Sequence, residues 1–286
     1  MYLFFKKITF FVCIIAIFTR AELSSDIEQI STLTVLEEQL DSLDSDALVV
    51  FDVDEVIFTD QDVILKPVGD PLKFQIFNER YAEAETAHEK DLTTSILSLP
   101  LIKAKKVLVE ELTPQLIDKL QKKSIKVIAL TSCPTRPFGI IKNFEKWRLN
   151  HIQGFCINFE KSFPDQKRFV FENITANNVP PPVYNQGVIF AEGFSKADVL
   201  AAFLKKLDFK PSKVIFIDDM YSNLQQMETK LTHMGIPHKG YYYIRVHADS
   251  EGDLNEEVAR FQFDYLFKHQ KWLSDQEAKE KLYLES

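Results

Sequence analysis

Short apolar runs, each about the length of one β-strand, constrain the fold of this chain more than any other feature. They cover residues 48–51, 127–130, 188–191, 214–217 and 241–246. Because apolar and polar residues do not alternate in these runs, both faces of each strand should be covered, as in a parallel sheet. The stretches between them have helical periodicity, and helices are expected at 113–122, 196–207 and 223–234. The sequence therefore predicts an α/β fold with helices on both faces of a parallel sheet.

Two segments interrupt this alternation of strands and helices. Residues 61–111 are charged and helix-prone, and we expect an inserted helical cap there. Residues 155–186 include three consecutive prolines at 180–182. Because proline removes a backbone donor and fixes φ, a hairpin or an extended surface excursion is expected in that segment. Near the C-terminus, Ser274 and Glu277 form the pattern of a capping box that opens a final helix.

Composition indicates a globular protein and disfavours a nucleic-acid partner. Hydrophobic residues make up 45% of the 286 residues and charged residues 27%, which is typical of a chain with a packed core. The formal net charge is -8. Binding to a phosphate backbone needs clustered Lys and Arg, and no such cluster is evident. An acidic chain also repels phosphorylated substrates at long range, so any phosphate chemistry needs a local cation or a few placed basic groups.

The first 21 residues have the pattern of an export signal. Lys6 and Lys7 precede an apolar run at 8–18, and residues 19–21 form a small-residue cleavage site. The run is shorter than the roughly 20 apolar residues of a spanning helix, so we expect cleavage and a secreted or periplasmic protein with no stable membrane span. Arg20 puts a charge at the cleavage site, and the alternative is a membrane anchor formed by an uncleaved N-terminal segment. Cleavage removes three basic residues and no acid, which changes the net charge from -8 to -11.

The cysteines give no sign of thiol chemistry. Cys13 lies in the export signal, which leaves Cys133 and Cys156. They could pair in an oxidising compartment, and two unpaired thiols are the alternative. Gly139 and Ser162 stand where a Cys-x5-Arg signature would need arginine, which argues against a thiol-based phosphatase.

Reactive polar residues follow three of the predicted strands. Asp52 follows the first apolar run, Thr131 the second, and Asp218 with Asp219 the fourth. Ligands of an open parallel sheet bind outside the carboxyl ends of its strands, so these side chains should meet in one crevice. Carboxylates gathered there repel one another unless a cation is present. Oxygen ligands beside a phosphate suit Mg²⁺.

Four segments resemble, in order, the four motifs of the haloacid dehalogenase (HAD) superfamily. They are VVFDVDEVIF, VIALT, GFSKADVL and VIFIDD. The resemblance implies a HAD core with a Rossmann-like parallel sheet in residues 22–286, a cap insertion at about 61–111, and a Mg²⁺-dependent phosphomonoester hydrolase that forms an aspartyl-phosphate. The export signal, the acidic chain and the ending at 272–275 also look like a group of exported bacterial HAD-like proteins of undefined function.

The resemblance implies a role for each motif residue. Asp52 would be the nucleophile toward phosphorus, and Asp54 would protonate the leaving group and then take a proton from the hydrolytic water. Thr131 would hydrogen-bond the phosphoryl oxygens, with Ser132 as the alternative. Lys196 would neutralise the charge of the nucleophile and the phosphate.

The same resemblance implies that Mg²⁺ is the cofactor and indicates its ligands. They would be the Asp52 carboxylate, the Asp54 backbone carbonyl and an acid of the last motif. Asp219 is the first choice for that acid, because it aligns with the acidic member of the family's GDxxxD pattern while Asp218 takes the usual glycine position. Asn223 replaces the second acid of that pattern, so the division of roles between Asp218 and Asp219 stays open.

The sequence does not define the substrate, and it leaves other function classes open. A small phosphorylated molecule is expected, and nucleotides, sugar phosphates and phosphoproteins are not distinguished. The alternatives are an inactive HAD-fold binding protein and a HAD phosphotransferase or phosphomutase. Arg136 could touch the substrate or lie on the surface. Glu55 is expected to be a solvated neighbour, with a role in shaping the site as the alternative. The six histidines lack the spacing of a zinc site and are expected to be structural or solvated.

Overall fold

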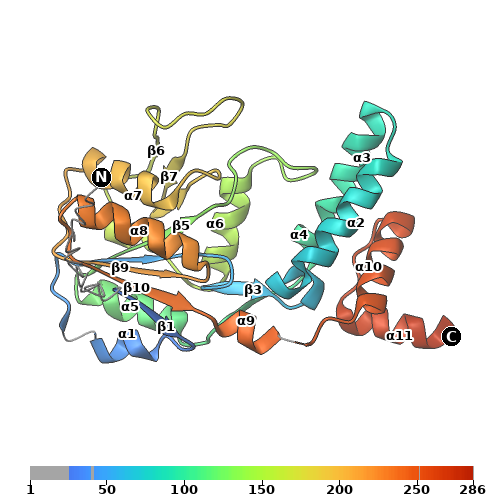
Figure 1. The fold of residues 1–286 in the computed structure, drawn as a ribbon, viewed down its shortest axis with the longest axis horizontal. Coiled ribbons are helices and arrows are strands. Elements are labelled where there is room, and N and C mark those ends of the chain that lie inside the picture. The colour runs from blue at the N-terminus through green and yellow to red at the C-terminus, as the bar shows by residue number, and fades with distance from the viewer. Residues whose placement is uncertain (1–25, 40–41, 251, 286) are drawn as a thin grey trace, which may run out of the picture.

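A computed structural model describes residues 26–39, 42–250 and 252–285, and it has an α/β fold with a mostly parallel central sheet (Figure 1). The strands of this sheet are β1 Ile27–Ile30, β2 Leu48–Phe51, β5 Lys126–Thr131, β6 Arg168–Val170, β7 Val183–Asn185, β8 Val188–Phe190, β9 Val214–Asp218 and β10 His238–Tyr243. Their order is β1-β10-β9-β2-β5-β8-β7-β6, and among the described strands of this sheet only the β6–β7 and β7–β8 pairs are antiparallel. The export signal predicted at residues 1–21 lies outside the described residues.

Four of the five predicted strands are confirmed, and the fifth was placed too far toward the C-terminus. The prediction for 241–246 rested on aromatic and β-branched residues, which favour strands. In the structure β10 ends at Tyr243, and Arg245 begins a helix, α9 (Arg245–Ser250). The reason is the length of the neighbouring strand. β1 ends at Ile30, which is in register with Tyr243, so no strand partner extends beyond that point.

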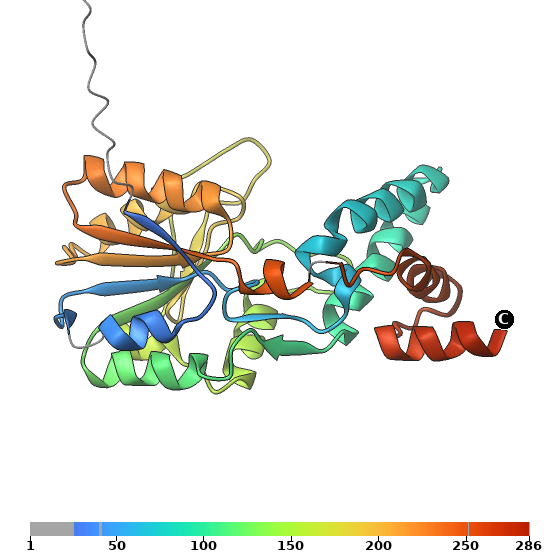
Figure 2. The ribbon, with the colours of Figure 1, turned by 60° about the horizontal axis from the view of Figure 1, so that its bottom comes forward.

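Helices cover both faces of the sheet (Figure 2). One face carries α1 (Thr34–Gln39), α5 (Thr113–Lys122) and α6 (Phe144–Gly154), and the other carries α7 (Lys196–Lys206) and α8 (Tyr221–His233). The three helices predicted between the apolar runs are confirmed as α5, α7 and α8, each to within two residues. None of the helices in the described part of the chain combines the length and the apolar character needed to cross a membrane.

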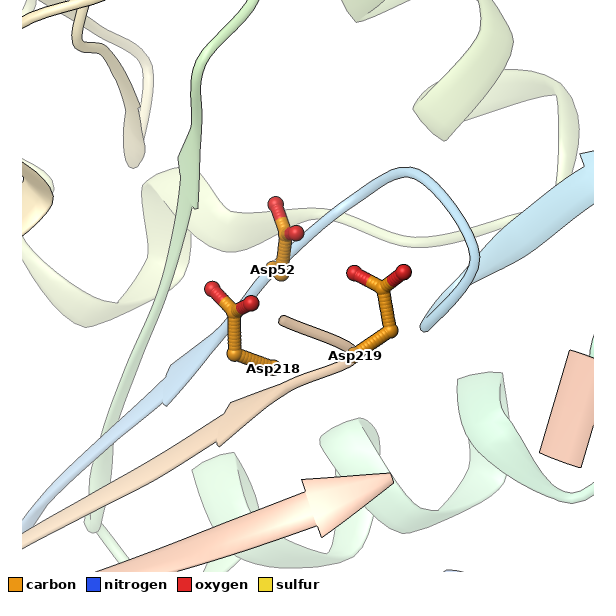
Figure 3. Close-up of side chains that lie close together, drawn as sticks. All are labelled: Asp52, Asp218 and Asp219. Carbon is orange, nitrogen blue, oxygen red and sulfur yellow. The ribbon is translucent and has the colours of Figure 1, made fainter. Parts of the chain in front are cut away.

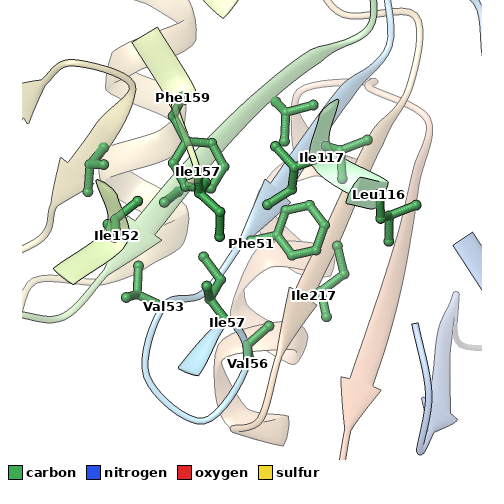
Figure 4. Close-up of a cluster of buried hydrophobic side chains, with 14 of the residues drawn as sticks. Phe51, Val53, Val56, Ile57, Leu116, Ile117, Ile152, Ile157, Phe159 and Ile217 are labelled. Atoms are coloured by element: carbon green, nitrogen blue, oxygen red, sulfur yellow. The ribbon is translucent and has the colours of Figure 1, made fainter. Parts of the chain in front are cut away.

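The core holds β2 rigidly in the middle of the sheet. Figure 4 shows Phe51, the last residue of β2, among Leu116 and Ile117 of α5 and Ile217 of β9. All four side chains are buried. Burying each such side chain contributes about 1.5–3 kcal/mol, so the strand that precedes Asp52 is strongly fixed.

A two-stranded ribbon connects the sheet to a group of helices at the carboxyl end of β2. Strand β3 (Phe58–Asp60) pairs antiparallel with β4 (Lys106–Leu108). The ribbon is closed by a buried ion pair in which Lys106 Nζ lies 2.7 Å and 2.6 Å from the two carboxylate oxygens of Asp60. The chain between these strands folds into η2 Val63–Leu65, η3 Pro67–Gly69, α2 Asp70–Glu83, α3 Ala87–Leu97 and α4 Leu99–Lys103.

The C-terminal helices α10 (Glu256–His269) and α11 (Asp275–Glu285) complete this group, and we call residues 61–105 and 252–285 together the helical unit. Its apolar core joins the two segments, because Phe263 and Trp272 pack in one cluster with Ile76 and neighbouring residues of the inserted segment. The helical character expected for 61–111 therefore describes most of that segment. Its association with the C-terminus was not predicted.

Polar contacts tie the two segments of the helical unit together. Trp272 Nε1 donates to Asp62 Oδ2 at 2.8 Å, and the backbone N of Asp275 donates to Asp62 Oδ1 at 3.0 Å. The predicted capping box at the start of α11 is confirmed: the backbone N of Ser274 donates to Glu277 at 2.8 Å, and the backbone N of Glu277 donates back to Ser274 Oγ at 3.3 Å. A buried aspartate thus fixes the entry into the last helix.

The segment at 155–186 forms the expected excursion, with a short helix η4 (Phe159–Ser162) followed by the β6–β7 hairpin at the edge of the sheet. Cys133, which is buried, and Cys156, which is exposed, are both free thiols. Of the two possibilities left open by the sequence, the structure has the unpaired one.

Candidate active site

Asp52 stands directly beyond the carboxyl end of β2, where the backbone is held by the neighbouring strand. Its N–H donates to the carbonyl of Ile217 at 2.9 Å, which continues the β2–β9 ladder by one residue. The side chain is buried, and its Oδ1 accepts from the N–H of Val53 at 2.7 Å. The carboxylate is therefore fixed in one orientation before any ligand arrives.

Lys196, the first residue of α7, reaches this carboxylate from another part of the chain. Ser195 caps the helix, accepting from the N–H of Asp198 at 3.4 Å. Lys196 Nζ lies 2.8 Å from Asp52 Oδ2 and 2.7 Å from Asp218 Oδ2, and the side chain is 3% exposed. Burial alone would lower the pKa of Lys196, but the two carboxylates outweigh it and raise the pKa above its ordinary value. Lys196 is thus a buried cation between two acids.

Three buried carboxylates meet at this point, from Asp52, Asp218 and Asp219 (Figure 3). One oxygen of each lies within 4.8 Å of the others. Burial raises the pKa of Asp52 and of Asp218, and the Lys196 ammonium opposes that rise. With one lysine for three carboxylates, two negative charges remain uncompensated when all the acids are ionised. Such a set of oxygens suits a divalent cation.

Asp218 and Asp219 differ in how far their oxygens are already occupied. Asp218 Oδ1 accepts from the N–H of Met220 at 2.8 Å and from Asn223 Nδ2 at 3.0 Å. Its Oδ2 accepts from Asn223 at 3.1 Å and from Lys196 at 2.7 Å. Asp219 accepts from His247 Nε2 at 3.1 Å through its Oδ2. Asp219 therefore keeps more acceptor capacity than Asp218, and Asn223 orients the Asp218 carboxylate.

His247 is a site residue that the sequence analysis missed. It lies on α9, immediately beyond the carboxyl end of β10, the strand next to β9. Its hydrogen bond to Asp219 raises the pKa of His247 above its ordinary value, against the effect of burial. The end of this predicted strand was a usable signal. This signal was not used, because the histidines were judged only by their lack of zinc-site spacing.

Thr131 ends β5 at the same edge of the sheet, since Phe51 of β2 is in register with Ala129 of β5. The Thr131 side chain is buried, and its oxygen accepts from the N–H of Cys133 at 3.0 Å. Its hydroxyl proton stays available for donation to a ligand. Ser132, the alternative considered from the sequence, is exposed.

Asp54 does not join the other acids, because a second missed residue holds its carboxylate. Arg148 of α6 forms an ion pair with it, with Nη1 2.8 Å from Oδ1, and Nη2 donates to Oδ2 at 3.0 Å. The Arg148 side chain is 7% exposed, whereas that of Asp54 is 43% exposed. Burial alone would lower the pKa of Arg148, and the Asp54 carboxylate raises it above its ordinary value. No sequence motif marks Arg148.

Glu55 is largely buried, contrary to the expectation of a solvated neighbour. It adopts a φ of 62° in the turn after β2, and its N–H donates to the carbonyl of Phe58 at 2.9 Å. Thr59 Oγ1 donates to its carboxylate at 2.5 Å. Burial raises the pKa of Glu55 to about 8. The reason for the error is the tight turn, which folds this side chain back against β3.

Sequence comparison assigns the chain to a family. The family described as "Protein of unknown function (DUF2608)" matches residues 21–279. The chain belongs to this family. It is 24% identical over 245 residues to an uncharacterized protein from Rickettsia prowazekii (strain Madrid E), covering 85% of each chain. An uncharacterized protein from Rickettsia typhi (strain ATCC VR-144 / Wilmington) is 29% identical over 210 residues, which are 70% of this chain and 69% of the relative. No solved structure matches the chain.

In this DUF2608 chain, Arg136 lies near the site on the loop after β5. Its side chain is 55% exposed, and its Nε lies 3.1 Å from Glu192 Oε1. Glu192 is buried and also accepts hydrogen bonds from the backbone N–H and the hydroxyl of Thr135. The loop that follows Thr131 is therefore anchored to the loop that leads to Lys196. Arg136 therefore lies on the surface, which is one of the two outcomes expected from the sequence. Its guanidinium is held by the ion pair with Glu192.

Proposed function

We propose that this DUF2608 protein is a Mg²⁺-dependent phosphomonoester hydrolase of the HAD type that works through an aspartyl-phosphate on Asp52. The observation that carries the proposal is the position of Lys196 Nζ, between the Asp52 and Asp218 carboxylates in a buried cluster that also contains Asp219. These groups come from three separate segments of the chain. The acids stand at the carboxyl ends of the adjacent parallel strands β2 and β9, the usual place for a ligand in such a sheet, and Lys196 reaches them from the start of α7.

The residues present fit a magnesium ion. All three clustered acids offer oxygen donors, and they carry more negative charge than Lys196 can balance. We propose that the Asp52 carboxylate, the Asp54 backbone carbonyl and Asp219 hold the ion, while Asp218 orients Lys196. The free acceptor capacity of Asp219 supports this division. When bound, Mg²⁺ would offset the charge of the phosphoryl oxygens and let them approach the nucleophile.

The reaction would proceed in two displacements at phosphorus. In the first, which requires the protonated form of Asp54, an Asp52 carboxylate oxygen forms a bond to phosphorus and the ester P–O bond breaks, while Asp54 gives its proton to the leaving oxygen and becomes the carboxylate that pairs with Arg148. In the second, water forms a bond to phosphorus, Asp54 takes a proton from that water, and the bond between phosphorus and Asp52 breaks. The products are an alcohol and inorganic phosphate.

Lys196 and Thr131 would bind and orient. The Lys196 ammonium lowers the repulsion between the Asp52 carboxylate and an incoming phosphate dianion, and it does so from a buried position where the interaction is weakly screened. The Thr131 hydroxyl would donate to a phosphoryl oxygen.

The helical unit would act as the cap over this crevice, with access through the region around residues 74–81. It would select among small phosphorylated molecules, whether nucleotides, sugar phosphates or phosphoproteins. The export signal predicted at residues 1–21 would place the activity outside the cytoplasm.

The test is hydrolysis of p-nitrophenyl phosphate by the purified protein, with and without Mg²⁺. We expect turnover that requires Mg²⁺ and is lost in Asp52→Asn but kept in Asp118→Asn, which changes a partly exposed aspartate on α5. Turnover that persists in EDTA or in Asp52→Asn would contradict the proposal. So would the absence of turnover across a broad panel of phosphate esters, the outcome expected of a binding protein. Products formed with added alcohols would separate hydrolysis from phosphoryl transfer.

A further inference from the structure

A buried arginine clamps the side chain of Asp54 by both of its carboxylate oxygens. Arg148 Nη1 lies 2.8 Å from Oδ1 and Nη2 lies 3.0 Å from Oδ2. The Nη2 contact is a hydrogen bond and the Nη1 contact is a close ion pair, so the guanidinium holds both carboxylate oxygens of Asp54 in place. The clamp comes from α6, a helix on a different part of the chain from the β2 turn that carries Asp54.

Arg148 itself has little freedom to move. Its guanidinium lies 5.2 Å from the ring centre of Phe58 and 4.9 Å from that of Trp147. The Trp147 ring is in turn packed edge-on against His151 at 4.5 Å. Aromatic rings at these distances attract a guanidinium group, and here they also enclose it. The donor half of the pair is therefore held by packing from several sides.

The exposure of the two partners differs in a way that packing alone does not explain. The Arg148 side chain is 7% exposed, but that of Asp54 is 43% exposed. Removing an arginine from water costs several kcal/mol, and an apolar side chain would fill the same space more favourably. The arrangement instead puts a rigid donor behind an acceptor that still faces solvent, two residues after Asp52. Such an arrangement suits a carboxylate that must keep one position while it acts on a bound ligand.

We propose that Arg148 is a positioning residue that holds Asp54 where the leaving oxygen of a phosphate ester departs. The inference rests on the proposed function, in which Asp54 delivers a proton to that oxygen. Proton delivery needs the two oxygens within hydrogen-bond reach, so a freely rotating Asp54 would be misplaced most of the time. The backbone on either side of Asp54 is already fixed, because the N–H of Ile57 donates to the carbonyl of Val53 at 3.0 Å. Arg148 fixes what remains, the side chain.

The leaving group decides how much this positioning matters. An alkoxide is a strong base and needs the proton as the P–O bond breaks, whereas p-nitrophenolate leaves without it. Loss of Arg148 should therefore slow hydrolysis of an alkyl phosphate much more than that of p-nitrophenyl phosphate. A purely structural role for Arg148 would slow both substrates equally.

The experiment compares kcat and KM of Arg148→Met and Arg148→Lys on ethyl phosphate and p-nitrophenyl phosphate at saturating Mg²⁺. For Arg148→Met we expect kcat on ethyl phosphate to fall by about 10²-fold, the usual size of a general-acid contribution, with less than about 10-fold loss on p-nitrophenyl phosphate and little change in KM. Arg148→Lys keeps the charge without the two-point contact, and it should show the same selective loss. If Arg148→Met fails to fold, Arg148→Lys alone still tests the inference.

Two further variants complete the test. Asp54→Asn with Arg148→Met should be no slower on ethyl phosphate than Asp54→Asn alone, because Arg148 acts through Asp54. Arg168→Met is the matched control: Arg168, on the edge strand β6, makes two hydrogen bonds of 2.9 Å to Glu145, a residue of the same helix as Arg148. We expect this control to keep the substrate preference of the unchanged protein.

The outcomes separate this inference from the proposed function. Equal losses on the two substrates, an effect on KM alone, or unchanged rates in both Arg148 variants would overturn the inference while hydrolysis by the unchanged protein stands. No hydrolysis of any phosphate by the unchanged protein would overturn both.

Discussion

Lys196 Nζ lies 2.8 Å from Asp52 Oδ2, and both side chains are buried although α7 and β2 are far apart in the sequence. The same amine lies 2.7 Å from Asp218, so a single buried cation serves two carboxylates. Removing one partner of such a group leaves uncompensated buried charge, which is more costly than the intact group. The stability of the crevice and its chemistry therefore depend on the same contacts.

Replacing Lys196 should therefore affect both the stability of the protein and its activity. We expect Lys196→Met to abolish phosphatase activity and to lower the free energy of unfolding by about 3 kcal/mol, the usual cost of breaking a buried ion pair. Urea unfolding followed by circular dichroism measures the second effect. Lys205→Met, an exposed change on the same helix, should leave both quantities near those of the unchanged protein. A stable Lys196→Met protein with normal activity would show that the buried contact is not needed.

Magnesium should stabilise the protein through the acid cluster. A ligand that binds only the folded state at a concentration about 100 times its Kd stabilises by about 2.7 kcal/mol. We therefore expect Mg²⁺ to raise the Tm in calorimetry. The rise should be much smaller in Asp219→Asn and unchanged in Asp165→Asn, which alters an exposed aspartate. An equal rise in all three proteins would point to a magnesium site elsewhere.

His151 should make stability fall on mild acidification. Burial, helped by Arg148 and Lys106 nearby, lowers the pKa of His151 from 6.5 to about 4. Between those values the unfolded chain binds a proton that the folded ring does not, so stability contributed by the neutral ring is present above pH 6.5 and is lost as the pH falls toward 4. Because the ring keeps some contact with solvent, we expect a loss of about 1–2 kcal/mol.

The measurement for His151 is the free energy of unfolding at several pH values in that window. His151→Phe should flatten the dependence, since phenylalanine packs against Phe58 and Trp147 without titrating. His88→Gln changes an exposed histidine and should keep the original slope. If His151→Phe retains that slope as well, another group is responsible.

The helical unit should depend on its C-terminal segment. Phe263 of α10 is fully buried and packs edge-on against Phe77 at 5.7 Å and Trp272 at 5.4 Å. We expect Phe263→Ala to destabilise by about 3–5 kcal/mol, the range for buried aromatic residues. Phe74→Ala is the control because Phe74 is exposed on α2 of the same unit. Thermal unfolding followed by tryptophan fluorescence would measure the loss, and equal effects of the two changes would argue against a shared core.

The residues that could be predicted from the sequence are those whose position follows from strand ends. Asp52, Thr131 and Asp218 each follow or end a buried apolar run, and parallel strands bring such ends together. Lys196 could be identified only through the resemblance to a known motif. On its own, a lysine at a helix start carries no signal.

Most of the missed contacts depend on tertiary packing, which a sequence pattern does not show. Arg148 sits inside a helix of ordinary composition, and only the packing of α6 turns it toward Asp54. His247 directly follows the predicted strand at 241–246, but it was set aside with the other histidines because they lack the spacing of a zinc site. The contact between Phe263 and the inserted segment joins parts of the chain that share no pattern, so the second half of the helical unit was not predictable.

The most direct test of the central claim is detection of the phosphorylated enzyme. We would mix the protein with Mg²⁺ and an activated phosphate ester, quench with acid during the first turnover, and locate the added phosphoryl group by peptide mass spectrometry. The account predicts phosphorylation of Asp52, dependent on Mg²⁺ and absent in Asp52→Asn. Phosphorylation of a different residue, or multiple turnovers without any phosphorylated enzyme in a quench fast enough to catch it, would contradict it.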